Sequence, residues 1–280
     1  MFVLKGNKAL GATSNPSAGA NRIRFFGLAS PLSPAVAGHP VRAPEDIDCV
    51  ATSGKGRKTC YVADPMTTTF AILLGGALSV DDRVRALVED ARVIAADSGI
   101  RHAKALGLTP ELWMGDFDSA VQSDHDAWPD VERQVHPAEK NHTDGELAIE
   151  AALERGAEKL VFVGALEGER TDHAGLHMIK AIALAERGLS ILLTSGDEEA
   201  VPVLPGRFTI DLPKGSLFSI LPFSDLTGVV IENARYPLDG LDMVFGSSRT
   251  LSNIAEGPVT VGLNSGRGLL IARPHDFTGS

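Results

Sequence analysis

The pattern of apolar and polar positions changes near residue 200. Between residues 70 and 196, short apolar runs alternate with stretches in which apolar residues recur at helical spacing. We expect strands at 70–76, 92–99, 111–119, 159–168 and 190–196, and helices at 81–91, 100–107, 143–156 and 171–188. Strands that alternate with such helices are joined by crossover connections, so the pattern predicts a parallel, Rossmann-like sheet in an α/β domain.

The helical spacing stops after residue 200, and short apolar runs separated by glycine and proline take its place. These runs lie at 207–212, 216–223, 227–238, 259–264 and 268–274. Short strands with frequent turn signals are typical of a β-sandwich or barrel. We therefore predict an α/β domain at 66–200, followed by a smaller all-β domain at 201–280.

The first 65 residues differ from the rest in charge and composition. They contain eight basic and four acidic residues, against 18 basic and 32 acidic residues in 66–280, which gives +4 and −14 within a total charge of −10. The segment is rich in glycine, alanine, serine and proline, as disordered segments are. Its first 44 residues contain no acid, as in organelle transit peptides, whereas Met66 offers an alternative translation start. We expect a disordered leader or a non-native extension.

Composition excludes several classes of protein. Two cysteines, at positions 49 and 60, are too few for a disulfide framework, so we expect a cytoplasmic protein in a reducing compartment. The apolar runs are far shorter than the ~20 residues of a membrane-spanning helix. A net charge of −10 argues against nucleic acid as a partner. It leaves room for an anionic small molecule, because a metal ion can bridge carboxylates to phosphates.

Acidic side chains stand where the predicted parallel strands end, which is where such sheets bind ligands. Asp97 closes one strand, and Asp116 and Asp118 close another in the segment GDFDS. Residues i and i+2 of an extended strand share a face, so the last two carboxylates can converge on Mg²⁺. A pair of this kind taken alone is more often a turn or helix cap.

A second polar segment, KNHTDGELA at 140–148, precedes a predicted helix. Thr143 and Glu146 have the spacing of a capping box, which is a structural role. The same helix start presents N–H groups to a phosphate, with Lys140 beside it and Asp144 as a further carboxylate.

Two glycine-containing segments are candidates for phosphate contacts. GALEGERTDH at 164–173 carries Arg170, whose planar fork suits phosphate oxygens, together with Asp172 and His173. An exposed ion pair is the alternative interpretation of that segment. Gly75 and Gly76 resemble a truncated phosphate loop but lack the complete motif.

The β region carries FGSSRTLSN at 245–253. Its hydroxyl and amide groups suit hydrogen bonds to a polar heterocycle, although a structural, turn-rich loop is the alternative.

Taken together, these segments resemble thiamine pyrophosphokinases (thiamin diphosphokinases) over residues 70–273. The resemblance lies in AADSG, GLTPELWMGDFDS, KNHTDGELA, GALEGERTDH and YPLDG…FGSSRTLSN, which follow the family's order and spacing. It implies an ATP-binding α/β domain, a thiamine-binding β domain and a homodimer with active sites at the subunit interface. It also implies Mg²⁺-dependent transfer of diphosphate from ATP to the thiamine hydroxyl, which releases AMP.

The resemblance assigns roles to individual positions. The implied catalytic carboxylates are Asp97, Asp116, Asp118 and Asp144, of which the last three would hold Mg²⁺. The implied ATP-binding residues are Gly75, Gly76, Asp97, Ser98, Gly115, Lys140, Thr143, Arg170, Asp172 and His173. The implied thiamine-binding residues are Tyr236, Ser247, Ser248 and Asn253. The chain departs from the family pattern at Leu147, where lysine is frequent, and at His177, where asparagine is frequent.

Two other functions are consistent with parts of the pattern. A metal-dependent phosphohydrolase could use the D-x-D pair, but that class requires threonine where Ala120 stands. A non-catalytic thiamine- or nucleotide-binding protein would bind ligands without turnover.

Overall fold

The computed structural model describes residues 59–60, 67–117, 122–136 and 142–278 of the 280-residue chain. The predicted leader, 1–65, lies outside the described residues apart from strand β1 (Thr59–Cys60). This strand pairs in parallel with β9 (Gly206–Ile210).

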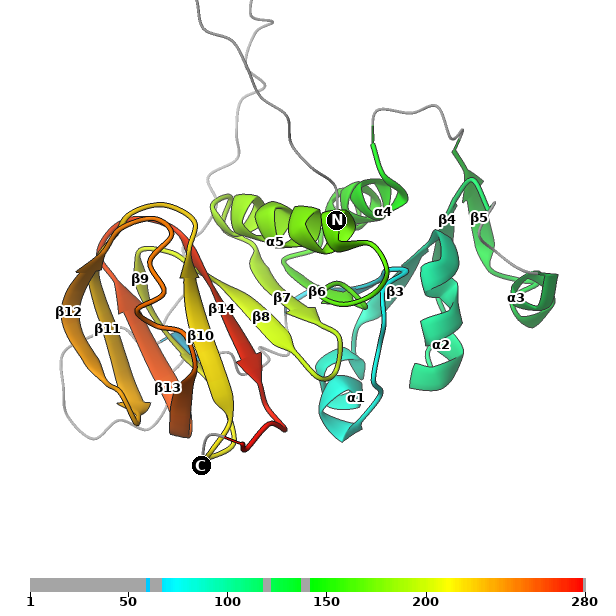
Figure 1. Ribbon diagram of the computed structural model, residues 1–280. Coiled ribbons are helices and arrows are strands. Elements are labelled where there is room, and N and C mark those ends of the chain that lie inside the picture. The colour runs from blue at the N-terminus through cyan, green and yellow to red at the C-terminus, as the bar shows by residue number, and fades with distance from the viewer. Residues whose placement is uncertain (1–58, 61–66, 118–121, 137–141, 279–280) are drawn as a thin grey trace, which may run out of the picture. The chain divides into compact units, whose positions relative to one another are not determined.

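The α/β part is built on parallel strands in the order β7-β6-β2-β3-β4-β5 (Figure 1). Their apolar runs are buried because helices cover both faces of the sheet. The exception is β5, whose residues are all exposed and which was not predicted. The bounds are β2 (Thr69–Leu73), β3 (Arg92–Ala96), β4 (Leu112–Gly115), β5 (Glu132–Val135), β6 (Lys159–Val163) and β7 (Ser190–Thr194).

The helices pack on opposite faces of this sheet, and alternate residues of each strand face alternate layers. Ala71 and Leu73 belong to the core that α1 and α2 help to form, whereas Phe70 and Ile72 belong to the core formed with α4 and α5. Figure 1 shows α4 and α5 on one side of the strands and α1 and α2 on the other. The bounds are α1 (Asp82–Val88), the 3₁₀ helix η1 (Asp97–Ile100), α2 (Arg101–Leu106), α3 (Gln122–Ala127), α4 (Asp144–Glu154) and α5 (Thr171–Ala185).

The antiparallel part continues from the same sheet. Strand β8 (Glu199–Val203) pairs antiparallel with β7 and with β14 (Gly268–Arg273). The remaining strands are β10 (Leu217–Pro222), β11 (Leu226–Ala234), β12 (Leu238–Met243) and β13 (Asn253–Leu263). Strand β13 pairs with β10 at its start and with β9 and β11 further along, so it joins two groups of strands. The predicted fold class, a parallel α/β region followed by an antiparallel β region, is confirmed.

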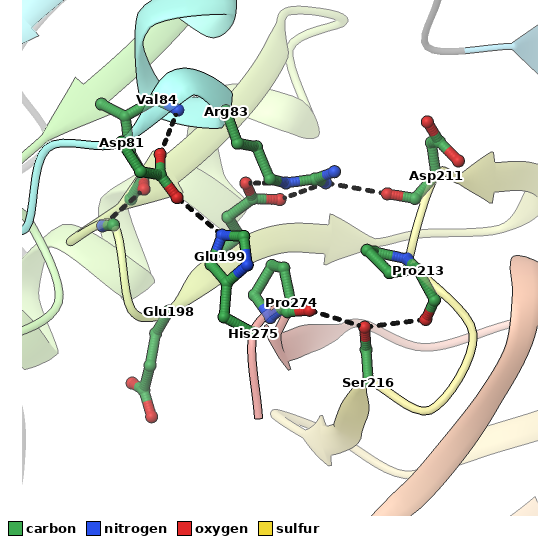
Figure 2. Close-up of polar contacts among 12 residues, drawn as sticks. Asp81, Arg83, Val84, Glu198, Glu199, Asp211, Pro213, Ser216, Pro274 and His275 are labelled. Carbon is green, nitrogen blue, oxygen red and sulfur yellow. Dashed lines mark hydrogen bonds and ion pairs between the residues drawn. The ribbon is translucent and has the colours of Figure 1, made fainter. Parts of the chain in front are cut away.

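Polar side chains connect α1 to the antiparallel strands (Figure 2). The guanidinium of Arg83 donates to both carboxylate oxygens of Glu199, at 2.5 and 2.8 Å, and to the carbonyl of Asp211 at 2.8 Å. Asp81 caps α1 by accepting from the N–H of Val84, and its other oxygen lies 2.6 Å from Nε2 of His275. The Glu199 side chain is only 1% exposed, so the contact between Arg83 and Glu199 is a largely buried ion pair.

Candidate active site

A cleft of about 910 Å³ opens at the carboxyl ends of the parallel strands. Its walls come from the segments after β2, β3, β4 and β6, from the start of α4 and from the first turns of α5. Parallel strands direct their following loops to one edge of the sheet, so segments far apart in sequence meet there. The position of the cleft agrees with the prediction made from the polar strand ends.

Most of the predicted nucleotide and catalytic residues line this cleft. Gly115 and Asp172 are absent from its lining. Asp118 and Lys140 lie outside the described residues. The predicted residues that the cleft brings together are Gly75, Gly76, Asp97, Ser98, Asp116, Thr143, Asp144, Arg170 and His173.

Asp97 has an unusual backbone conformation. Its φ is +45°, in the left-handed region, which a residue other than glycine occupies at some energetic cost. The indole N–H of Trp113 donates to the Asp97 carbonyl at 2.8 Å and holds this turn in place. A Cβ on Gly115 would lie 3.3 Å from Cα and Cβ of Asp97, so glycine lets β4 approach the turn closely. Gly115 therefore leaves the space that the Asp97 turn occupies next to the end of β4.

The start of α4 forms the predicted capping box. The Thr143 hydroxyl accepts from the N–H of Glu146, and the Glu146 carboxylate accepts from the N–H of Thr143, both at 3.2 Å. The ammonium of Lys180 on α5 lies 3.1 Å from the other Glu146 oxygen. Burial alone would raise the pKa of Glu146, but the Thr143 N–H and Lys180 outweigh burial and leave this pKa below its ordinary value. The cap thus fixes Thr143 and Asp144 at the cleft.

Arg170 and Asp172 pair with each other. Nε and Nη2 of Arg170 donate to the two carboxylate oxygens of Asp172, at 3.0 and 2.8 Å. The hydrogen bond from Arg170 holds the pKa of Asp172 well below its usual range. Both side chains are 65% exposed, so the ion pair that was the alternative interpretation of this segment is present in the structure.

The backbone at Gly76 and Ala77 is hydrogen-bonded to the loop that follows β6. The N–H of Gly76 donates to the carbonyl of Gly164 at 3.1 Å, and the next N–H, of Ala77, donates to the carbonyl of Glu167 at 2.9 Å. A Cβ on Gly76 would lie 2.3 Å from both of those carbonyl oxygens, so glycine is required by close packing of two loops. The N–H groups of Gly76 and Ala77 are therefore engaged with backbone carbonyls, so these two groups would not make the contacts of a phosphate loop.

Sequence reasoning missed several titratable side chains that line the cleft with the predicted ones. They are Arg101, His142, Glu167, Glu169 and His177. Arg101 follows Asp97 by four residues, one helical turn, and this spacing could have indicated it. His177 is half-buried, and burial lowers its pKa below the ordinary value. His177 follows the predicted His173 by four residues on α5, so the same one-turn spacing could have indicated it.

The predicted thiamine residues lie in the antiparallel part and are absent from the lining of the described cleft. Asn253 is buried and exchanges hydrogen bonds with the backbone of Tyr236, at 3.1 Å from its N–H and 2.8 Å to its carbonyl. Tyr236 is 61% exposed. Ser247 accepts a hydrogen bond from the N–H of Arg249, and Ser248 is exposed. Asn253 therefore has a structural role beside its predicted one.

In residues 59–60, 67–117, 122–136 and 142–278, no three histidine, cysteine or acidic side chains are placed to hold a metal ion by themselves. Across the same ranges, no helix is long and apolar enough to cross a membrane.

Comparisons with known proteins agree with this arrangement. The family described as Thiamin pyrophosphokinase, catalytic domain, matches residues 84–193, and Thiamin pyrophosphokinase, vitamin B1 binding domain, matches residues 207–268. The thiamine pyrophosphokinase of Bacillus subtilis is 28% identical over 170 residues, which cover 57% of this chain and 76% of that protein.

Solved structures of such proteins also superimpose on the chain. The crystal structure of the Bacillus subtilis thiamine pyrophosphokinase aligns with a TM-score of 0.66 at 24% identity, over 75% of this chain and 100% of that one. The crystal structure of the thiamin pyrophosphokinase from Geobacillus thermodenitrificans aligns with a TM-score of 0.62 at 25% identity, over 74% of this chain and 97% of that one. The two matching domains, in this order and on this fold, place the chain in the thiamin pyrophosphokinase family.

Proposed function

We propose that the protein is a thiamine pyrophosphokinase, which transfers diphosphate from ATP to the hydroxyl of thiamine and releases AMP. One observation carries the proposal. Asp97, Asp116 and Asp144 come from three separate segments and line one cleft in a chain that matches both domains of the family. Phosphoryl and diphosphoryl transfer depend mainly on positioning and on neutralising charge, which such a cleft can supply.

The cleft fits Mg²⁺ as the metal. Carboxylate oxygens are the ligands that Mg²⁺ prefers, and the ion binds through one or two carboxylates plus water and substrate phosphates. A cluster of three described ligands is therefore not required, because any one or two of the carboxylates of Asp116, Asp144 and the predicted Asp118 would hold the ion. Bound there, Mg²⁺ supplies positive charge to the phosphate oxygens.

The side chains of the cleft have complementary tasks in this proposal. Asp97 or Asp144 would orient the thiamine hydroxyl and accept its hydrogen bond. The start of α4, fixed by its capping box, directs its N–H groups and positive dipole end toward the transferred phosphates. The acidic lining also suits thiamine, whose thiazolium ring is a cation.

We further propose a homodimer in which each active site combines the cleft of one subunit with the thiamine residues of the other. The absence of Tyr236, Ser247, Ser248 and Asn253 from the described cleft supports this arrangement. Large apolar side chains in the same region are exposed, with values of 69% for Val244 and 67% for Phe245, as expected of an interface. A cytoplasmic location, expected from the cysteine usage, also remains part of the proposal.

The decisive assay incubates the purified protein with thiamine, ATP and Mg²⁺ and follows AMP and thiamine diphosphate by chromatography. We expect both products in equal amounts. Release of inorganic phosphate without AMP would support the phosphohydrolase instead, and binding without turnover would support the non-catalytic protein. Asp116→Ala should abolish AMP release while the circular dichroism spectrum stays unchanged. Turnover above about a tenth of wild type at saturating Mg²⁺ would contradict its metal role.

A hybrid experiment tests the shared site. Ser248→Ala should mainly raise the KM for thiamine, whereas Asp116→Ala removes turnover. When both variants are co-expressed and assayed at limiting thiamine, half of the dimers are hybrids with one unaltered site. About a quarter of wild-type turnover should then return. Activity no higher than that of the Ser248→Ala protein alone would place both residues in sites built from a single subunit.

A further inference from the structure

The described cleft is strongly acidic, although the proposed co-substrate is a polyanion. The acidic side chains that line it are Asp97, Asp116, Asp144, Glu146, Glu167 and Glu169. Among the described lining residues, only Arg101 and Arg170 carry a permanent positive charge. A triphosphate that enters this cleft needs cationic partners beyond a metal ion. The question is therefore which of these two guanidinium groups is already paired with a carboxylate.

Arg170 is already engaged. Two of its N–H groups donate to Asp172 in a bidentate pair at 3.0 and 2.8 Å. The pair is compact and largely self-neutralising, so most of its attraction for a further anion is cancelled.

Arg101 is held differently. Its Nη2 donates to the carbonyl of Gly75 and, at 3.4 Å, to that of Gly76. Within the ranges that the structure describes, no carboxylate forms an ion pair with Arg101, and its Nε and Nη1 make no hydrogen bond. Its charge is therefore not cancelled by a neighbouring acid, and part of its fork still faces the cleft.

Two backbone N–H groups of the loop after β2 are already engaged. The N–H groups of Gly76 and Ala77 donate to other carbonyls, and the carbonyl of Gly76 also accepts from Nε2 of His102 at 2.9 Å. The loop after β2 thus acts as a platform whose carbonyls anchor the head of Arg101. An anchored guanidinium loses less conformational freedom on binding than a mobile one does.

We propose that Arg101 is a phosphate-binding residue of this protein, which contacts the triphosphate of the nucleotide with the part of its fork left open above Gly75 and Gly76. The proposal rests on the proposed function, because it requires ATP in the cleft. It assigns an anion contact at this loop to a side chain of α2, where the N–H groups of Gly76 and Ala77 are already engaged.

Arg101→Gln and Arg85→Gln test the proposal as a matched pair. Arg85 is also exposed and also donates to two carbonyls, those of Leu106 and Ala105 at 3.1 and 2.9 Å, but it is not part of the cleft lining. Both variants lose one positive charge and two arginine-to-carbonyl hydrogen bonds. Calorimetric titrations with Mg·ATP, with inorganic tripolyphosphate and with adenosine then separate the phosphate contact from the base and ribose contacts.

We expect Arg101→Gln to weaken the binding of Mg·ATP and of tripolyphosphate by about 10- to 100-fold, and that of adenosine by less than about 2-fold. Arg85→Gln should match wild type for all three ligands. Arg101→Lys should fall between wild type and Arg101→Gln for tripolyphosphate, because it keeps the charge but loses the planar fork.

Three results would overturn the proposal. Equal affinities of wild type and Arg101→Gln for tripolyphosphate would show that Arg101 makes no phosphate contact. Equal losses for adenosine and Mg·ATP would show that the variant only distorts the cleft. If wild type itself bound no Mg·ATP, the proposed function would fall together with this inference.

Discussion

Replacing Arg83 by methionine tests whether the buried ion pair between Arg83 and Glu199 stabilises the packing of α1 against the antiparallel strands. Methionine retains much of the apolar stem of arginine but leaves the Glu199 carboxylate, 1% exposed, without its bidentate partner (Figure 2). Loss of one member of a buried pair costs about 3–5 kcal/mol, because the remaining charge stays desolvated. Since 24% of the Arg83 side chain is exposed, water can partly replace it, and we expect the lower end, about 3 kcal/mol.

Urea unfolding followed by circular dichroism measures this loss, and thermal unfolding checks it. For a folded body of this size, a loss of about 3 kcal/mol lowers the Tm by roughly 6–12 °C. Arg207→Met is the control, because its partner Glu232 and Arg207 itself are 55% and 41% exposed, and such pairs contribute about 0–1 kcal/mol. The double variant Arg83→Met/Glu199→Gln should recover about half of the loss, since it removes the unpaired charge.

The physical reasoning would be refuted by an Arg83→Met protein that is destabilised no more than Arg207→Met. It would also be refuted if the double variant were less stable than Arg83→Met alone, because neutralising Glu199 would then relieve nothing. In either case the contact between α1 and β8 would depend on apolar packing instead of on the ion pair.

Three further measurements follow from other positions. Burial lowers the pKa values of His102 and His177 in the folded state, so the unfolded chain binds more protons below the ordinary value of about 6.5. As the pH falls from 7 to 5.5, the free energy of unfolding should decrease by up to about 1.4 kcal/mol per pH unit for each histidine. If the His102→Gln/His177→Gln variant kept the same dependence of stability on pH, this explanation would be wrong. Gly76→Ala should lower the free energy of unfolding by more than about 2 kcal/mol, because the new Cβ would meet two backbone oxygens. Gly175→Ala is the control. It has open space around it in α5 and should raise the free energy of unfolding by up to about 1 kcal/mol, as measured by thermal unfolding. Asn253→Ala should lower stability by about 1–3 kcal/mol as well as thiamine affinity, since its buried hydrogen bonds are lost; an unchanged Tm would argue against its structural role.

The sequence was most informative about elements with a strong local period. The apolar runs became β2, β3, β4, β6 and β7, and the amphipathic stretches became α1, α2, α4 and α5, with ends shifted by a few residues. The strand predicted at 92–99 ends at Ala96, because Asp97 turns into the left-handed region and begins η1. The capping box at Thr143 was also visible in advance, since it depends only on neighbours three residues apart.

Elements without a burial period were missed. The residues of β5 are exposed throughout, and only Met243 of β12 is buried, so neither strand shows an alternation of buried apolar and exposed polar positions. Strand β8 lies in the segment 197–206, whose three acids and two prolines do not resemble a strand. One of those acids, Glu199, is buried because it pairs with Arg83 of α1.

The sequence by itself determined the strands and helices that have a strong local period, and the polar residues that close them, since these depend on local periodicity and capping. Only the tertiary structure decided which of those residues meet, because the order of parallel strands brings Asp97, Asp116 and Asp144 to one cleft. It also decided what the glycines do. The N–H groups of Gly76 and Ala77 donate to carbonyls of a neighbouring loop, and Arg101 lines the cleft beside them. Hydrogen bonds between segments about 90 residues apart cannot be read from either segment alone, because each is satisfied only after the chain has folded.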